Sequence, residues 1–287
     1  MTLLVTGATG RVGRQVVHQL VKRSADVRVL VREPSKADFP AAVSVVQGDM
    51  LDIDSLRTAF SGVRTLFLLN GVAGDEFTQA LIALNLAREA GIERVVYLSV
   101  FDADRFVNVP HFAVKSGAER MIEQMGFSAT ILRPAYFMDN ELMIKDTIVD
   151  HGVYPIPIGS TGVAMIDVRD IAEVAAIELI RRNDAPGKLP VGTINLVGPD
   201  TLTGPELASI WSALLGRPVA YGGDDPTAFE SNFATFMPKW MAYEMRLMAE
   251  RYVSDGMAPQ AGDVERLTAI LGRPLHTYRD FAAALVR

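Results

Sequence analysis

A glycine-rich turn near the start of the chain constrains the fold more than any other feature. An apolar run, Leu3–Val5, leads directly into Thr6–Gly13, which reads TGATGRVG, and a helical pattern with an apolar face follows. Backbone amides at a helix N-terminus carry partial positive charge and unmet hydrogen-bond donors, so a pyrophosphate binds there favourably. The order of strand, glycine turn and helix therefore predicts a dinucleotide-binding site, with an ordinary structural turn as the alternative.

Each glycine of the turn has its own expected role. Gly7 allows the tight turn, Gly10 lets the backbone approach the phosphates, and Gly13 lets the helix pack closely on its strand. The spacing is GxxGxxG instead of GxGxxG, so we expect a turn that is one residue longer than usual. Three residues between the glycines are expected to contact the dinucleotide as well: Thr9, Arg11 and Val12.

The end of the second expected strand, Asp26–Val31, bears on the choice of cofactor. An NAD site needs a carboxylate at this point for the ribose 2′-hydroxyl, whereas NADP needs a cation for the 2′-phosphate. The chain has Arg32 here, and Arg11 in the turn is placed to reach the same phosphate. This favours NADP(H). NAD(H) stays possible, because Glu33 follows directly and a strand-end arginine can also be a simple solvated charge.

Further strands are expected at residues 43–47, 65–69, 94–99 and 129–132, and they alternate with helices. This rhythm predicts an α/β fold of the Rossmann type, with a doubly wound parallel sheet covered on both faces. Such sheets bind ligands at the carboxyl ends of their strands. Three residues at those ends are therefore candidates for the cofactor site: Asp49 for the adenine, and Asn70 and Gly71 for a ribose or phosphate.

Beyond residue 150 the pattern loosens. We expect residues 1–150 to form the dinucleotide-binding domain, with residues 160–200 returning in part to its sheet, and residues 151–287 to form a small, mostly helical substrate-binding lobe. Residues 221–235 are rich in Gly, Asp, Asn and Pro and predict a loop. Residues 236–252 carry a methionine and aromatic face, which packs into a core or also borders the cofactor cleft.

Composition excludes several classes of function. The net charge of −6 over 287 residues argues against nucleic-acid binding. There is no cysteine, which excludes disulfides and thiolate metal sites, and the four histidines are scattered, so we expect no metal site. No apolar stretch approaches membrane-spanning length. We expect a cytoplasmic protein that acts on a small molecule and does not bind membranes.

Two places in the middle of the chain are candidates for chemistry. Ser99 ends the fifth strand, and His111 and Lys115 lie four residues apart, on one face of an expected helix beside the nicotinamide. Lys115 is suited to bind the nicotinamide ribose or to act as an acid, and His111 to supply a proton. The alternatives are a surface ion pair between Lys115 and Glu119, and a first-turn His111 with no catalytic role.

Together these segments resemble the NmrA-like branch of the atypical short-chain dehydrogenase/reductase superfamily. The resemblance covers essentially the whole chain. It rests on the following motifs: TGATGRVG at 6–13, VR at 31–32, GD at 48–49, HFAVK at 111–115, LRP at 132–134 with YF at 136–137, DVRDIA at 167–172, and PLHTYRDF at 274–281.

The resemblance implies an NADP(H)-binding Rossmann domain, with Tyr136 among the cofactor contacts, and a lobe that shapes a substrate pocket together with residues 134–140. In short-chain dehydrogenases generally, a YxxxK pair and a serine transfer the proton. Here Lys115 matches the lysine and Ser99 the serine, but His111 replaces the tyrosine. This departure disfavours alcohol dehydrogenation. It leaves an NAD(P)H-dependent oxidoreductase that reduces a small apolar conjugated electrophile: a quinone, imine, enone or carbonyl.

Two other functions stay open at this point. Some relatives are not enzymes and sense the NADP redox state through a protein partner, and the lost tyrosine favours that reading. An NAD-dependent epimerase-like enzyme is a weaker alternative, because that chemistry usually relies on the same missing tyrosine.

Overall fold

The contacts within the chain divide it into two compact units. The computed structural model describes residues 1–286, with the side chain of Lys36 left out of the description. The first unit comprises Met1–Asp104, His111–Arg133 and Val168–Ile194, and the second comprises Arg105–Pro110, Pro134–Asp167 and the chain from Asn195 onward. Each unit is therefore built from segments that are far apart in the sequence.

A seven-stranded sheet forms the centre of the fold, in the order β3-β2-β1-β4-β5-β6-β8. The pairs from β3 through to β6 are all parallel. Because the order reverses between β1 and β4, the carboxyl ends of these two strands form the switch point where such sheets bind ligands. The expected Rossmann-type fold is confirmed. The strands are β1 (Thr2–Val5), β2 (Val27–Val31), β3 (Ser44–Gln47), β4 (Val63–Leu68), β5 (Arg94–Leu98), β6 (Ser128–Pro134) and β8 (Gly192–Leu196).

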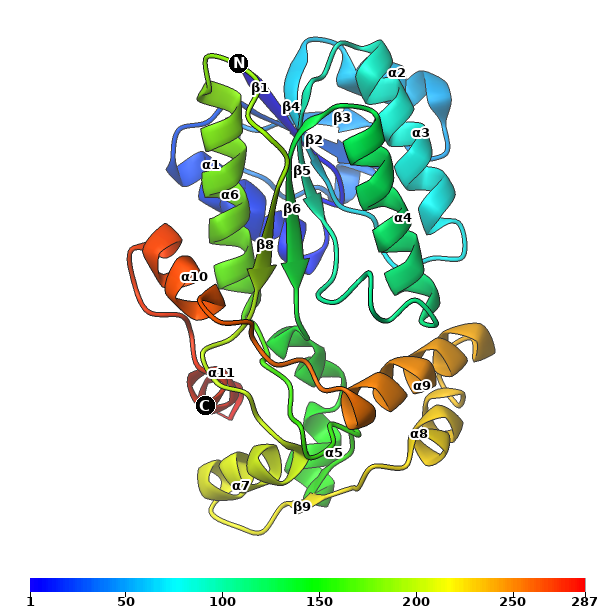
Figure 1. Cartoon of the computed structure of the whole chain (residues 1–287), viewed down its shortest axis with the longest axis vertical. Coiled ribbons are helices and arrows are strands. Elements are labelled where there is room, and N and C mark those ends of the chain that lie inside the picture. The colour runs from blue at the N-terminus through cyan, green and yellow to red at the C-terminus, as the bar shows by residue number, and fades with distance from the viewer. Residues whose placement is uncertain (287) are drawn as a thin grey trace. The chain divides into compact units, whose positions relative to one another are not determined.

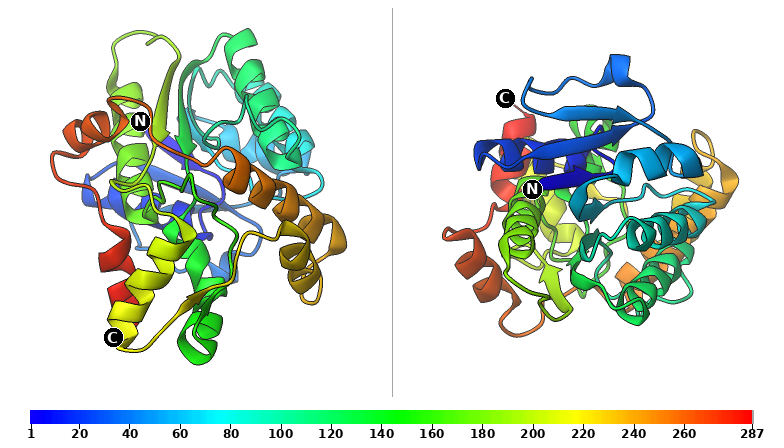
Figure 2. Two further views of the ribbon diagram at one scale, coloured as in Figure 1. Left: turned by 60° about the horizontal axis from the view of Figure 1, so that its bottom comes forward. Right: turned by 90° about the horizontal axis from the view of Figure 1, so that it is seen from above.

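Helices cover both faces of this sheet (Figures 1 and 2). On one face, α1 (Arg11–Lys22) packs against α6 (Val168–Asp184). The other face carries α2 (Ile53–Phe60), α3 (Glu76–Glu89) and α4 (Pro110–Gln124). A buried apolar cluster fills the space beneath these three helices, with Phe60, Leu84 and Ile122 from the helices meeting Leu66 and Val95 from the strands. Burial of both faces explains why the central strands are almost entirely apolar. A short 3-10 turn, η1 (Pro34–Lys36), follows β2.

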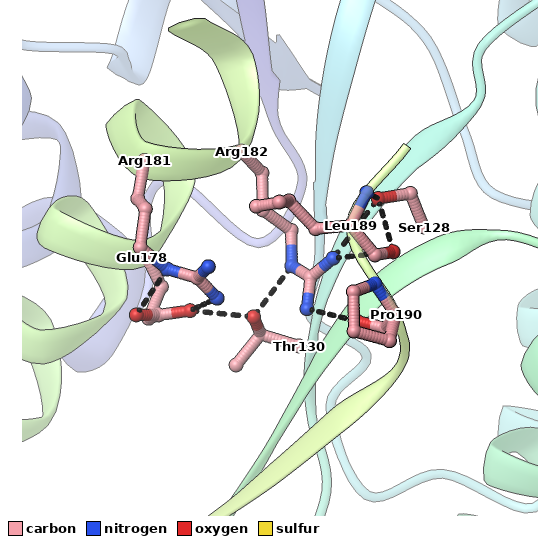
Figure 3. A network of polar contacts seen from close by, with 7 residues as sticks. All are labelled: Ser128, Thr130, Glu178, Arg181, Arg182, Leu189 and Pro190. Atoms are coloured by element: carbon pink, nitrogen blue, oxygen red, sulfur yellow. Dashed lines mark hydrogen bonds and ion pairs between the residues drawn. The ribbon is translucent and has the colours of Figure 1, made fainter. Parts of the chain in front are cut away.

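A buried arginine ties the end of α6 to the start of β6 (Figure 3). The guanidinium of Arg182 donates through Nε to the Thr130 hydroxyl at 2.6 Å, through Nη1 to the Ser128 hydroxyl at 3.0 Å, and through Nη2 to the Pro190 carbonyl at 3.0 Å. Thr130 in turn donates to Glu178 at 2.6 Å. Arg182 is only 1% exposed, so these bonds are shielded from water. The network holds α6 and the segment after it against the sheet.

The second unit is mostly helical, and its one small sheet pairs β7 (Val153–Tyr154) with β9 (Ala220–Tyr221) in parallel. Within it, α8 and α9 lie side by side (Figures 1 and 2). The helices are η2 (Met138–Met143), α5 (Lys145–His151), α7 (Gly204–Leu215), α8 (Pro226–Phe233), α9 (Lys239–Ser254), α10 (Asp263–Leu271) and α11 (Tyr278–Leu285).

Helix α8 corrects the expectation of a loop over residues 221–235. The Asp225 side chain caps this helix by accepting from the amides of Thr227 and Ala228, and Pro226 occupies its first turn, where a missing N–H costs nothing. Phe229 and Phe233, one turn apart, are both buried. Capping and burial of this apolar face outweigh the local richness in turn-forming residues.

A fully buried carboxyl, Glu141 of η2, links three elements of the second unit. It accepts hydrogen bonds from the hydroxyls of Tyr154 at 2.8 Å and Tyr278 at 3.0 Å. The Trp211 indole N–H completes the chain by donating to the Tyr278 hydroxyl at 2.7 Å. All of these side chains are buried, so the network is satisfied internally without water.

Candidate dinucleotide site

The glycine turn forms a close-packed cradle between β1 and α1. Gly7 has a φ of +62°, a backbone conformation that side chains rarely allow, and its carbonyl accepts from the amide of Gly10 at 3.0 Å. A Cβ at Gly13 would lie 2.2 Å from the Gly7 carbonyl oxygen and 2.8 Å from Cα of Ala8. The helix therefore packs against the turn itself, and not only on the strand as the sequence suggested.

The start of α1 keeps amide donors for a ligand. Gly10 is its N-cap and supplies no side-chain hydrogen bond, and the first turn contains no acidic residue. The first amides of a helix need acceptors from outside the helix, and an anion serves this purpose. With no side-chain cap and no acidic residue at its start, α1 fits the diphosphate of a dinucleotide.

Thr6 connects this cradle to the segment that directly follows strand β4. The buried Thr6 hydroxyl accepts from the amide of Leu69 at 2.8 Å and donates to the Leu69 carbonyl at 3.1 Å. Asn70 comes next and is only 5% exposed, and among the described residues neither its amide nitrogen nor its oxygen has a hydrogen-bond partner. A buried amide without partners costs free energy. A polar ligand at the switch point would supply those partners.

A pocket of about 380 Å³ opens where β2 and β3 end. The carboxylates in it already accept backbone amides: Asp49 from Leu51 at 2.9 Å, and Asp52 from the first turn of α2. Arg32, which is exposed, is the one cation among the six lining residues. The position of Arg32 suits a phosphate on the adenosine ribose. The lining residues are Arg32, Gln47, Gly48, Asp49, Asp52 and Ser55.

Lys115 is buried in an ion pair that the sequence did not predict. Its ammonium lies 2.8 Å from a carboxylate oxygen of Glu76, at the start of α3, and donates to the Leu98 carbonyl at 3.1 Å. The Lys115 and Glu76 side chains are 7% and 1% exposed. The expected alternative, a surface pair with Glu119, is therefore wrong, because Lys115 turns inward toward α3 instead of along its own helix.

Glu119 has other partners. It accepts two hydrogen bonds from the Arg133 guanidinium, at 3.0 Å from Nε and 2.6 Å from Nη2, and one from the Ser99 hydroxyl. The hydroxyl proton of Ser99 is thus engaged in a hydrogen bond to the Glu119 carboxylate. Sequence reasoning missed Glu76 and gave Glu119 the wrong partner, because these side chains meet their partners only after the sheet has formed.

Three other predicted site residues, His111, Gly71 and Tyr136, have different surroundings. His111 is half-buried in the first turn of α4, with its ring against Phe112 at 4.6 Å between centroids. Gly71 is exposed, and a Cβ there would meet nothing within 4 Å among the described residues. Tyr136, in the second unit, is buried with its ring edge-on to Tyr252 of α9 at 5.9 Å. Two segments expected to shape a substrate pocket, residues 134–140 and α9, are thus in contact.

The described residues contain neither a candidate metal cluster nor a candidate membrane-spanning helix. No three His, Cys, Asp or Glu side chains gather there in a way that would hold a metal ion. None of the helices over residues 1–286 combines the length and apolar character needed to cross a membrane.

A family model matches nearly the whole sequence. The model is that of the NmrA-like family, and it matches residues 1–281. The chain belongs to the NmrA-like family. Its architecture agrees, since a Rossmann-type sheet and a helical second unit are what the resemblance implied.

Relatives of this NmrA-like chain include named reductases. It is 29% identical to the NAD(P)H azoreductase of Xenophilus azovorans, and the match covers 98% of this chain and 97% of that one. It is 30% identical to the (4-alkanoyl-5-oxo-2,5-dihydrofuran-3-yl)methyl phosphate reductase of Streptomyces griseus, over 98% of this chain and 96% of that one. A similar solved structure is the NADPH-dependent quinone oxidoreductase of Escherichia coli in complex with NADPH, with a TM-score of 0.88 and 24% identity over 99% of this chain and 100% of that chain.

Proposed function

We propose that this chain is an NADP(H)-dependent oxidoreductase that delivers hydride to a small, apolar, conjugated electrophile. The observation that carries the proposal is the cradle at the switch point, where α1 begins without a side-chain cap and the buried Asn70 amide lacks partners among the described residues. The relatives support the choice of reaction, because the azoreductase, the dihydrofuranone phosphate reductase and the quinone oxidoreductase are all named as reductases or oxidoreductases.

Each part of the first unit would hold one part of the cofactor. Gly7, Gly10 and Gly13, with the amides at the start of α1, would bind the diphosphate. Arg32 and Arg11 would bind the 2′-phosphate, and Asn70 a ribose or the nicotinamide side. When bound, the reduced nicotinamide supplies the hydride. Lys115 would lie on the nicotinamide side, oriented by its bond to the Leu98 carbonyl.

The choice of a conjugated acceptor follows from the proton donors. The Ser99 hydroxyl donates its hydrogen bond to the Glu119 carboxylate. His111 occupies the position at which short-chain dehydrogenases carry the tyrosine that protonates an alkoxide. Hydride addition to a quinone, azo compound or enone leaves a delocalised anion, which needs less help from a protein acid than an alkoxide does. A half-buried imidazole such as His111 would suit this less demanding proton transfer.

The test is NADPH oxidation measured against quinones, azo dyes, imines, enones and aldehydes, with Lys115→Ala alongside. We expect turnover on at least one conjugated acceptor, weak or no turnover on simple aldehydes, and a large loss in the Lys115 variant. If the protein binds NADPH but shows no turnover on any acceptor, the proposed reductase activity is wrong. The alternative function, a redox sensor that acts through a protein partner, would then be favoured.

Arg32→Ala is expected to weaken NADPH binding by about ten- to a hundredfold, since it removes a charge-assisted bond of about 1.5–3 kcal/mol to the 2′-phosphate. NADH binding should change little. Calorimetric titration with both cofactors measures this difference. Arg57→Ala, on the exposed surface of α2, is the control for the loss of one positive charge. Equal losses of affinity for NADPH and NADH would show that Arg32 does not bind the 2′-phosphate.

A further inference from the structure

The ion pair between Glu76 and Lys115 is unusual because of its burial. Lysine and glutamate are rarely buried this deeply unless they are paired. Here the Lys115 nitrogen lies 2.8 Å from a Glu76 carboxylate oxygen, and the ammonium also donates a hydrogen bond to the Leu98 carbonyl. Removing one partner of such a pair leaves the other charge uncompensated where water screens it poorly. Whether this buried region is neutral or charged therefore depends on the presence of both partners.

The packing of α3 on α4 seats the carboxylate opposite the ammonium. Phe77, the residue after Glu76, lies over Gly117, and a Cβ at Gly117 would come within 2.9 Å of the phenyl ring. A larger residue at position 117 would have to displace the Phe77 ring next to Glu76. Glu76 also lies in the first turn of α3, where the helix dipole favours a negative charge.

The charges around Lys115 balance. Glu76 cancels Lys115, and Glu119 cancels Arg133 through two hydrogen bonds. The Tyr97 ring lies 5.2 Å from the Lys115 ammonium, and burial together with Glu76 and Glu119 raises the pKa of its hydroxyl well above the ordinary value, so it carries no charge. Two cations therefore face two buried anions, Glu76 and Glu119, and the exposed Asp104 also pairs with Arg133 at 3.3 Å.

We propose that Glu76 is a positioning residue that acts through Lys115 to set the relative affinity for oxidised and reduced cofactor. This inference rests on the proposed function, which puts Lys115 beside the nicotinamide. That ring carries a positive charge in NADP⁺ and none in NADPH. With its charge cancelled by Glu76, Lys115 can contact the cofactor without repelling the oxidised form. A lone Lys115 ammonium would disfavour NADP⁺, and a lone Glu76 carboxylate would favour it.

Calorimetric titrations with NADPH and NADP⁺ test this in four proteins: the wild type, Glu76→Gln, Lys115→Met, and the double variant. We expect the ratio of the dissociation constants, NADP⁺ over NADPH, to rise about tenfold in Glu76→Gln and to fall about tenfold in Lys115→Met. The double variant restores charge balance and should return near the wild-type ratio. Thermal unfolding of each variant shows whether it is folded.

Shifts of the same sign in the two single variants, or a double variant that keeps the ratio of one of them, would overturn the inference. If Glu76→Gln does not fold, the step from Lys115→Met to the double variant carries the same test, since the ratio must rise again. A wild type that binds neither cofactor form would instead overturn the proposed function. The two failures are therefore distinguishable.

Discussion

Replacing Gly13 by alanine is expected to lower the free energy of unfolding by about 3 kcal/mol and to abolish measurable binding of NADPH. The added Cβ would lie 2.2 Å from the Gly7 carbonyl oxygen and 2.7 Å from the Gly7 carbonyl carbon. Both are backbone atoms, which cannot move aside as a flexible side chain would. The helix must therefore withdraw from the turn, and the amides of α1 move with it.

Denaturant unfolding and calorimetric titration measure the two effects of Gly13→Ala. Gly71→Ala is the matched control for the effect on stability, because a Cβ there meets nothing within 4 Å among the described residues. Its stability should stay within about 0.5 kcal/mol of the wild type. A Gly13→Ala protein with unchanged stability would contradict the close contact between helix and turn.

Glu141 is expected to make the protein less stable as the pH rises. Burial raises the pKa of this carboxyl from its ordinary value of 4.5 to about 7, against the opposing effect of the bonds from Tyr154 and Tyr278. The folded state thus holds the proton more tightly than the unfolded state does. The resulting stabilisation is fully present below about pH 4.5 and is lost as the pH passes through 7. The loss is of the order of 3 kcal/mol.

Denaturant unfolding between pH 5 and pH 8 checks this expectation in the wild type and in Glu141→Gln. Most of the decline from this group should be missing in the variant, which has nothing to ionise at that position. Glu265→Gln, an exposed position in the same unit, should leave the decline unchanged. Parallel pH profiles for the wild type and Glu141→Gln would show that the buried carboxyl does not titrate in this range.

Local patterns were sufficient to predict the Rossmann-type alternation of strands and helices. Residues that are adjacent in the sequence specify the succession of β1, the glycine turn and α1. A run of adjacent apolar residues likewise marks a buried strand such as β4. Arg32 could also be placed from sequence, because the end of β2 has a fixed relation to the cradle in this fold. Whether Arg32 and the other predicted residues bind the cofactor is a prediction that the experiments above address.

The partners of the polar side chains could not be predicted in the same way. Lys115 has a candidate partner four residues away on its own helix, yet it pairs with Glu76, which lies two elements earlier in the chain. The local pair would lie in water and contribute little, whereas the pair with Glu76 neutralises a charge that the packing of α4 buries. Helix α8 was missed for a related reason, since two buried phenylalanines outweighed turn-forming neighbours.

The Arg182 network has a consequence for the order in which the chain can fold. Arg182 and its carbonyl partner at Pro190 follow residues 134–167 of the second unit in the sequence, yet they complete the first unit. A ribosome must therefore synthesise part of the second unit before the first can close. Until then the apolar face of α1 lacks α6, and β6 is an open sheet edge, the kind of surface that promotes aggregation. A fragment ending at residue 150 would keep that exposed edge permanently.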